Sequence, residues 1–192
     1  LIKNKKIILG SASPRRQELL RLLGIDFETR ISNSDESYQV NLSPEEIPIF
    51  LAIKKKEVLK ETIKANEILI TADTIVVKEE EILNKPKDEQ EACEMLSSLS
   101  NDMHQVITGV CISNHEKQEV FSVTTNVFFK KLTTQEIDFY VKEYKPFDKA
   151  GAYGIQEWIG LIGIKKITGC YFNVVGLPVA KLYQKLIQFD AL

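Results

Sequence analysis

Apolar residues along the chain follow two spacings, one typical of helices and one typical of strands. Leucines spaced for one helix face follow Ser13-Pro14, which suits an N-cap and a first helical residue, and Gly24 ends the run. Alternating β-branched residues over 105–113 and 119–129 predict two long paired strands. Further strands are expected over 5–9, 27–31, 67–71, 75–77, 81–83 and 161–167, and further helices over 48–65, 88–99, 133–144 and 177–188. Strands interleaved with helices indicate an α/β domain with antiparallel pairing in its middle.

Two of these boundaries depend on the surrounding residues. Ser43-Pro44-Glu45-Glu46 resembles a capping box, but a helix that begins at Pro44 loses a hydrogen bond at Pro48, so we expect the helix to begin at Pro48. Residues 72–74 are expected just beyond the end of the strand over 67–71, followed by a small hairpin. Residues 33–41 predict a polar loop.

The composition predicts one domain over 1–192, because 44% of the 192 residues are hydrophobic, enough for a sizeable core. The net charge of −2 argues against a nucleic-acid partner or an anionic membrane, so any anionic ligand needs a local cluster of basic groups. Residues 1–13 loosely resemble a signal peptide, but their apolar run is too short and a first strand explains it better. No stretch is long enough to span a bilayer, and we expect a cytoplasmic protein.

The cysteines and histidines do not predict a metal centre. Cys93, Cys111 and Cys170 are far apart and lack zinc-site spacing, so buried free thiols in a reducing compartment are expected. With only His104 and His115, a multi-histidine site is ruled out. One histidine before a strand, such as His104, is more often structural than a phosphate contact.

The first candidate motif is Ser11-Ala12-Ser13-Pro14-Arg15-Arg16, at a turn from strand to helix. Unpaired N–H groups and the positive end of the helix dipole suit a phosphate there. Two arginines in the first turn oppose that dipole, and a bound anion removes the conflict. An ordinary N-cap with two solvated arginines explains the same residues.

Each of four further motifs has an ordinary structural explanation when it is taken alone. Asp73, in Thr71-Ala72-Asp73-Thr74, suits a cation or a water beyond a strand end, although a turn aspartate is the commoner case. Lys85-Pro86 alone is an ordinary surface turn. The segment over 149–156 carries small residues around one tyrosine and one glutamine, which suits a backbone packed against a ligand or a tight loop. Residues 173–178 mainly indicate the start of a helix.

Together, in this order, the motifs resemble the Maf family of nucleotide pyrophosphatases over nearly the whole chain. Gly-Ala-Tyr-Gly-Ile-Gln at 151–156 is similar to the branch that acts on dTTP and UTP. The resemblance implies a mixed central sheet flanked by helices in two lobes around a cleft, similar to the inosine triphosphate pyrophosphatase architecture. It also implies a divalent metal cation, Mg²⁺ or Mn²⁺, a cytoplasmic location and a homodimer. Gly10, Asn84 and Glu157-Trp158 depart from the family's usual residues, and the last departure puts the substrate choice in question.

The resemblance also implies roles for individual residues. Asp73 matches the proton acceptor and is expected to share a metal with Glu36. Arg15, Thr74 and Gln156 match specificity positions. Further cleft-lining positions are matched by Ser13, Arg16, Lys55 and Lys85. We expect the arginine pair, Asp73 and the loop of Gln156 to converge on one cleft.

The expected reaction splits a nucleoside triphosphate into the monophosphate and pyrophosphate by metal-assisted attack of water on the α-phosphorus. A free aspartate is a weak base at neutral pH, so the metal must acidify the water or burial must raise the basicity of Asp73. The Gln156 amide can accept from the ring N–H of uracil or thymine, but when flipped it suits cytosine. Arg15 offers only donors, which match carbonyl oxygens. Turnover of 7-methyl-GTP or other modified nucleotides, and a nucleotide-binding regulator of septum formation without turnover, remain alternatives.

Overall fold

The computed structural model describes residues 5–38 and 41–189. Residues 39–40 of the expected polar loop and residues 1–4 lie outside this description. The strands are β1 (Lys6–Leu9), β2 (Phe27–Thr29), β3 (Glu67–Lys78), β4 (Glu81–Leu83), β5 (Met103–Ser113), β6 (Gln118–Phe129) and β7 (Ile164–Thr168). The helices are α1 (Pro14–Leu22), α2 (Glu46–Leu59), α3 (Glu89–Leu99), α4 (Thr134–Tyr144), α5 (Trp158–Gly163), α6 (Tyr171–Val175) and α7 (Val179–Gln188), with 3-10 turns η1 (Lys60–Thr62) and η2 (Ala150–Ala152).

The chain divides into two compact units. The first unit contains the described residues of Leu1–Asp73, Thr108–Val123 and Gly176–Leu192, and the second contains Thr74–Ile107 and Thr124–Val175. Strands β3, β5 and β6 contribute residues to both units. The expectation of a single domain over 1–192 stays a prediction.

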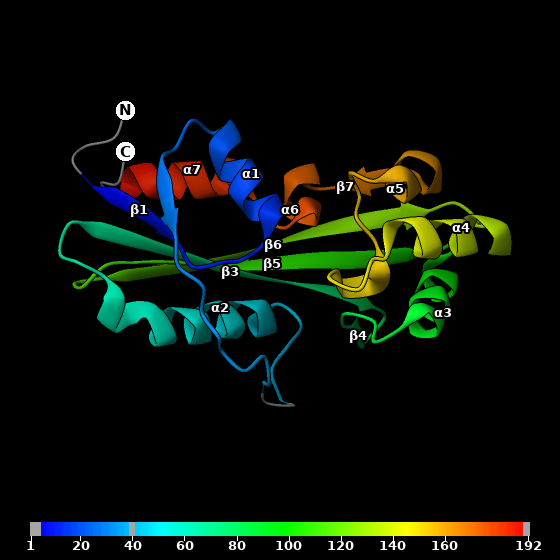
Figure 1. The fold of residues 1–192 in the computed structure, drawn as a ribbon, viewed down its shortest axis with the longest axis horizontal. Coiled ribbons are helices and arrows are strands. Elements are labelled where there is room, and N and C mark those ends of the chain that lie inside the picture. The colour runs from blue at the N-terminus through cyan, green and yellow to red at the C-terminus, as the bar shows by residue number, and fades with distance from the viewer. Residues whose placement is uncertain (1–4, 39–40, 190–192) are drawn as a thin grey trace. The chain divides into compact units, whose positions relative to one another are not determined.

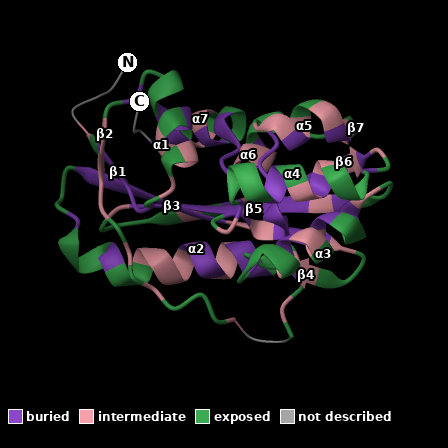
Figure 2. Cartoon of the chain, turned by 45° about the vertical axis from the view of Figure 1, so that its right-hand side comes forward, coloured by how far each residue is buried: buried purple, intermediate pink, exposed green. Residues whose placement is uncertain are grey.

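In the first unit, β1 lies between two parallel neighbours. Ile8 pairs with Glu28 of β2 on one side and with Leu69 of β3 on the other. Helices α1 and α7 cover one face of the sheet and α2 covers the other (Figure 1). Buried residues run along β1 and β3 (Figure 2), and the completely buried side chains of Ile7, Ile8 and Leu9 explain why β1 is apolar after Lys6. The first unit therefore holds the turn from β1 to α1 on a rigid base.

The second unit is built on antiparallel pairs. Strand β4 pairs with the end of β3, where Val76 lies opposite Leu83, and β7 pairs with β6. Its core gathers apolar side chains from β6, α3, α4 and the segment before α5, among them Phe129, Leu96, Tyr140 and Ile155. Helix α4 begins with a capping box between Thr133 and Glu136, at the start of the helix expected over 133–144. With parallel pairs in one unit and antiparallel pairs in the other, the predicted mixed sheet flanked by helices is confirmed.

The largest correction concerns β3, which the sequence predicts to end near Thr71. The strand instead continues without a break to Lys78 and includes Ala72, Asp73 and Thr74. Ala and Asp are poor strand formers, and this local signal indicated an end. Burial of Ala72 and pairing of the later residues with β4 outweigh the local preference. Asp73 therefore lies within a strand and not beyond the end of one.

Three smaller differences concern helices. Helix α2 begins at Glu46 and not at Pro48, because a proline in the first turn occupies a position where its missing N–H has no helical partner. Residues 161–163 belong to α5 and only 164–168 form the strand; Leu161 is 81% exposed, so its apolar character did not indicate a strand. Helix α6 was not expected as a separate element.

No helix among the described residues is both long and apolar enough to cross a membrane. All three cysteines are free, as expected, but only Cys111 is buried, and Cys93 and Cys170 are half-buried. Burial raises the pKa of the Cys111 thiol to about 11.

Candidate active site

The turn between β1 and α1 forms a close-packed start to the first helix. Gly10 donates its N–H to the Ile70 carbonyl at 2.7 Å. A side chain at Gly10 would meet Thr71 Cγ2 at 2.6 Å, so this departure from the usual family residue lets the turn lie tightly on β3. The Ser13 hydroxyl accepts the N–H of Arg16, as the predicted N-cap requires.

Arg16 is held at this turn by side-chain and backbone acceptors. Its Nη1 donates to Ser11 Oγ at 3.3 Å, and its Nε donates to the Gly176 carbonyl at 2.8 Å. Burial lowers the pKa of Arg16, Asp73 and Glu36 oppose that shift, and Arg15 adds to it. The first candidate motif and the start of the last helix therefore meet at one guanidinium, and Asp73 is near enough to influence it.

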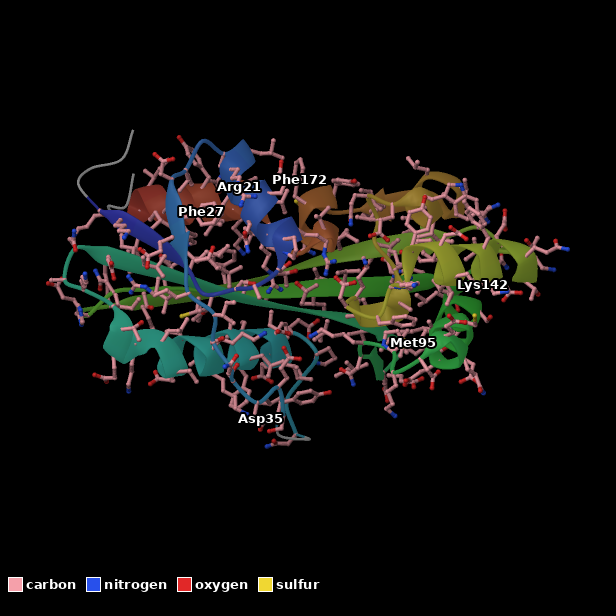
Figure 3. All side chains as sticks on the ribbon, viewed as in Figure 1. Arg21, Phe27, Asp35, Met95, Lys142 and Phe172 are labelled. Carbon is pink, nitrogen blue, oxygen red and sulfur yellow. The ribbon has the colours of Figure 1, made fainter. Side chains whose placement is uncertain are left out.

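Lys55 joins the two acidic candidates. Its ammonium group donates to Asp73 Oδ1 and lies 3.3 Å from Glu36 Oε1. The side chains of Lys55 and Asp73 are each 12% exposed, whereas that of Glu36 is 51% exposed. The adjacent Lys54 pairs instead with Asp35, which lies in the loop beside α2 (Figure 3). The neighbouring lysines Lys54 and Lys55 of α2 thus pair with different carboxylates, and of the two it is Lys55 that contacts Asp73 in β3.

These residues form what we call the ionic cluster: Arg16, Glu36, Lys55 and Asp73. Its members come from α1, the loop before α2, α2 and β3, all within the first unit. Two cationic and two anionic side chains lie close together at a site that is partly shielded from water. A bound anion can pair with the cationic side chains, and a bound cation can pair with the carboxylates. Such a cluster is suited to a substrate that carries both phosphates and a metal ion.

The donor set of the cluster fits a divalent cation that is shared with a ligand. Asp73 and Glu36 supply hard carboxylate oxygens. Both carboxylates pair with the same cationic group, the ammonium of Lys55. Within 5–38 and 41–189, no group of three or more His, Cys, Asp or Glu side chains is arranged to hold a metal ion. Mg²⁺ commonly uses one or two protein carboxylates and completes its shell with phosphates and water, which matches this set.

In the second unit, two loops carry the remaining candidates. Lys85 is exposed in the loop after β4, and Pro86 beside it is buried. The carbonyl of Asn84 accepts the N–H of Gly151 at 3.2 Å, which ties this loop to the segment over 149–157. Gly151 has φ +68, and a side chain there would meet Val76 Cγ1 at 3.0 Å. The small residues of this segment are therefore required by a tight backbone path.

The segment over 149–157 is fixed by buried hydrogen bonds. The hydroxyl of Tyr140 in α4 accepts the Gly154 N–H at 3.0 Å and donates to Glu157 Oε2. Lys149 lies 3.1 Å from Glu157 Oε1 and is itself only 8% exposed. Burial and the Glu157 carboxylate raise the pKa of Tyr140, so its hydroxyl keeps its proton.

Tyr153, within the same segment, anchors it through the hydroxyl group of its side chain. Its hydroxyl lies 2.7 Å from His104 Nε2, and both rings pack edge-on against Phe129. Burial lowers the pKa of His104 to about 4, which keeps the ring neutral at neutral pH. His104 is therefore structural, as the sequence indicates. Asn173 is also structural, because it donates to Val106 and Thr125, each at 3.0 Å.

The predicted site residues divide between the two units. Ser13, Arg15, Arg16, Glu36, Lys55 and Asp73 belong to the first, and Thr74, Lys85 and Gln156 belong to the second. The structure brings Arg16, Asp73, Lys55 and Glu36 together. The convergence of Gln156 with the arginine pair stays a prediction.

Sequence reasoning did not identify Tyr140, Lys149 and Glu157 as a connected group. Lys149 is the first residue of the recognised motif and Glu157 directly follows it, and a lysine next to small, buried residues is a signal for a buried ion pair. No sequence spacing links either residue to Tyr140, which lies in another helix.

Comparison with solved structures identifies the fold. The structure of the Ham1 protein from Staphylococcus aureus matches 97% of this chain and 100% of that chain, with a TM-score of 0.52 and 16% sequence identity. The chain thus shares the Ham1 fold, as expected. The family model described as Maf-like protein matches residues 6–189. This chain belongs to the Maf family.

Relatives of similar length carry a specific name. A protein from Parabacteroides distasonis is 52% identical over 189 residues, which cover 98% of each chain, and is named dTTP/UTP pyrophosphatase. Proteins of the same name from Christiangramia forsetii and Porphyromonas gingivalis are 52% and 48% identical over 186 and 191 residues. These matches cover 97% and 98% of this chain and 95% and 96% of those relatives.

Proposed function

We propose that this protein hydrolyses dTTP and UTP to the nucleoside monophosphate and pyrophosphate. The observation that carries the proposal is the ionic cluster, in which a strand aspartate is held by Lys55 beside the Arg16 guanidinium. Relatives named dTTP/UTP pyrophosphatase that are about half identical over nearly the full chain support the choice of nucleotides.

In the proposed reaction, a water oxygen bonds to the α-phosphorus while the bond from that phosphorus to the bridging oxygen breaks. Pyrophosphate leaves with the electron pair of that bond. Asp73 orients the water and accepts its proton on a carboxylate oxygen. Lys55 holds this carboxylate in place, which reduces the reorganisation that the step requires.

In this proposal, basic side chains and backbone N–H groups bind the phosphates. Arg16, Lys55 and Lys85 supply positive charge, and the first turn of α1 after Ser13 supplies backbone N–H groups. A phosphate that binds Lys55 and Arg16 replaces part of their pairing with Asp73 and Glu36. Asp73 keeps part of its contact with Lys55, and the part that is exchanged opens both carboxylates to the cation and the water.

Asp73 and Glu36 would hold a divalent cation, Mg²⁺ or Mn²⁺. When bound, the ion neutralises phosphate charge and lowers the pKa of a water molecule that it binds. Asp73 has both the metal role and the proton-accepting role in this proposal.

Recognition of the base rests on Arg15, Thr74 and Gln156. The Gln156 amide pairs with the ring N–H and one carbonyl of uracil or thymine, and Arg15 donates to carbonyl oxygens. A base with an exocyclic amine at the same position leaves these donors unpaired, which supplies discrimination.

A nucleotide panel tests the proposal. Purified protein is incubated with UTP, dTTP, CTP, the purine triphosphates and 7-methyl-GTP in Mg²⁺ or Mn²⁺, and released pyrophosphate is measured. We expect UTP and dTTP to have the highest kcat/KM. A preference for 7-methyl-GTP would replace the proposed substrate, and tight nucleotide binding without pyrophosphate release would indicate a regulator.

The family resemblance also supports a homodimer that works in the cytoplasm, without a nucleic-acid or membrane partner. Light scattering on the purified protein tests the dimer: a mass of one chain at micromolar concentration would contradict it.

A further inference from the structure

Glu157 is more firmly held than an ordinary loop carboxylate. Lys149 lies 3.1 Å from its Oε1, and Tyr140 donates to its Oε2. The Glu157 side chain is 20% exposed and that of Lys149 is 9% exposed, so the pair is largely removed from water. Because Tyr140 also accepts the Gly154 N–H, the carboxylate and the loop backbone are fixed by the same hydroxyl.

The Gln156 amide and this carboxylate lie on the same side of Gly154. A side-chain carbon built on Gly154 would meet Gln156 Nε2 at 2.8 Å and Glu157 Oε2 at 3.0 Å. Both groups therefore crowd the same face of Gly154, and the nitrogen end of the amide is the end directed there. A larger residue at 154 would have to displace the ends of both side chains.

We propose that Glu157 is a positioning residue that fixes the orientation of the Gln156 amide and thereby selects uracil and thymine against cytosine. The inference rests on the proposed function and deepens it. A carboxylate attracts the amide N–H₂ and repels the amide carbonyl, so the nitrogen stays on the side of Glu157. One N–H of the amide then faces Glu157, and Oε1 and the second N–H are presented to the base.

The chemistry of the bases turns this orientation into selectivity. Uracil and thymine carry a ring N–H that donates to Oε1, whereas the ring nitrogen of cytosine at the same position is an acceptor and is repelled by it. A flipped amide would suit cytosine instead. Gln156 alone can adopt either orientation of its amide, and the negative charge of Glu157 favours the one that suits uracil and thymine.

The decisive variant is Glu157→Gln, which keeps the size of the side chain and removes its charge. A neutral amide at 157 can face Gln156 with either end, so the preferred orientation is lost. We expect the ratio of CTP to UTP dissociation constants, measured by calorimetry with non-hydrolysable α,β-methylene analogues, to fall about 10-fold, the size of one charge-assisted contact. Glu143→Gln, at an exposed position of the same unit, is the matched control and leaves the ratio unchanged.

A second variant protects the test against a folding defect. Tyr140→Phe keeps the charge of Glu157 but removes the hydroxyl that holds it, and we expect a smaller fall in the same ratio, about 3-fold. If Glu157→Gln does not fold by circular dichroism, Tyr140→Phe decides. An unchanged ratio in the folded variants, or equal losses of affinity for both analogues, overturns the inference.

The binding measurement separates this inference from the proposed activity. Pyrophosphate release from UTP and dTTP by the unaltered protein is measured in parallel. Absence of release, with a uracil preference that Glu157→Gln weakens, refutes the activity and supports the role of Glu157. Release of pyrophosphate with no change of preference in Glu157→Gln refutes the role of Glu157 alone.

Discussion

The ionic cluster of the first unit and the segment over 149–157 of the second unit both contain buried or half-buried charges, but they are built differently. In the ionic cluster, Lys55 pairs with Asp73 and with Glu36, and Arg16 lies near enough for both carboxylates to influence its pKa. In the segment over 149–157, the backbone itself is fixed, because Tyr140 accepts a backbone N–H and Asn84 accepts another.

This difference matches two different tasks. Ion pairs between side chains can exchange partners with a charged ligand, which suits binding and release of phosphates. A backbone held by buried hydrogen bonds keeps its shape when a ligand arrives, which suits recognition of a flat base by its hydrogen-bond pattern. The comparison predicts that changes in the cluster alter the rate, whereas changes around the segment alter selectivity or stability.

The largest expected effect is that of Asp73→Asn on turnover. The amide keeps the shape of the side chain but does not accept the proton of the water, so we expect kcat to fall about 10²–10⁴-fold in a pyrophosphate-release assay with UTP. Asp35→Asn is the matched control, because Asp35 is an exposed aspartate of the same unit that pairs with Lys54. Turnover of Asp73→Asn near that of Asp35→Asn would remove Asp73 from the mechanism.

The next effect concerns stability in the second unit. The pKa of His104 is lowered from 6.5 to about 4 by burial, so the unfolded chain binds a proton more readily than the folded one between these values. Stability therefore falls as the pH falls from about 6.5 toward 4, by about 3 kcal/mol in total. A proton on Nδ1 would have no acceptor, since this buried atom makes no hydrogen bond with the described residues.

Urea denaturation at several pH values measures this effect. His104→Gln should flatten the dependence of unfolding free energy on pH in this range. His115→Gln changes the exposed histidine and should leave the dependence as it is. The same slope in His104→Gln as in the unaltered protein would show that other groups cause the loss of stability.

Much of the fold was predictable because its signals are local. Ser13-Pro14 is a capping pattern that acts within one turn, and α1 begins where it indicates. Helix α4 also begins beside Thr133, where the sequence predicts the start of a helix. The end of β3 was misjudged because its continuation past Asp73 depends on pairing with β4 and on burial, which come from other segments. Local propensity does not contain that information.

The candidate site shows the same division. The Ser11–Arg16 turn was identified from residues close in sequence, whereas Lys85 became a candidate only through the family resemblance. The bridge from Lys55 to Asp73 joins residues of α2 and β3, and only the fold reveals that Lys55 and not Lys54 makes it. The contacts of Tyr140 with Glu157 and Gly154 also join separate elements, so their pattern is absent from the sequence.

That choice between neighbouring lysines gives a further test. Lys55→Gln removes the charge that holds Asp73 and a proposed phosphate ligand, and we expect kcat/KM for UTP to fall about 30-fold, less than for loss of the proton acceptor. Lys54→Gln removes an equal charge one residue earlier, where the partner is Asp35, and should change kcat/KM less than 2-fold, as expected of an exposed pair. Equal losses in the two variants would mean that total charge, and not the bridge, matters.

The smallest expected effect tests whether the division of tasks is complete. Arg15 lies beside the ionic cluster in sequence but is proposed to contact the base, so Arg15→Ala should reduce the preference for UTP over CTP about 10-fold while kcat for UTP changes less. Arg21→Ala is the control, because Arg21 lies on α1 near Phe27 and pairs with Glu18 (Figure 3). Equal losses for every nucleotide in Arg15→Ala would assign Arg15 to the phosphates. The first unit would then act on the phosphates alone, and selection of the base would rest on Thr74 and Gln156 in the second.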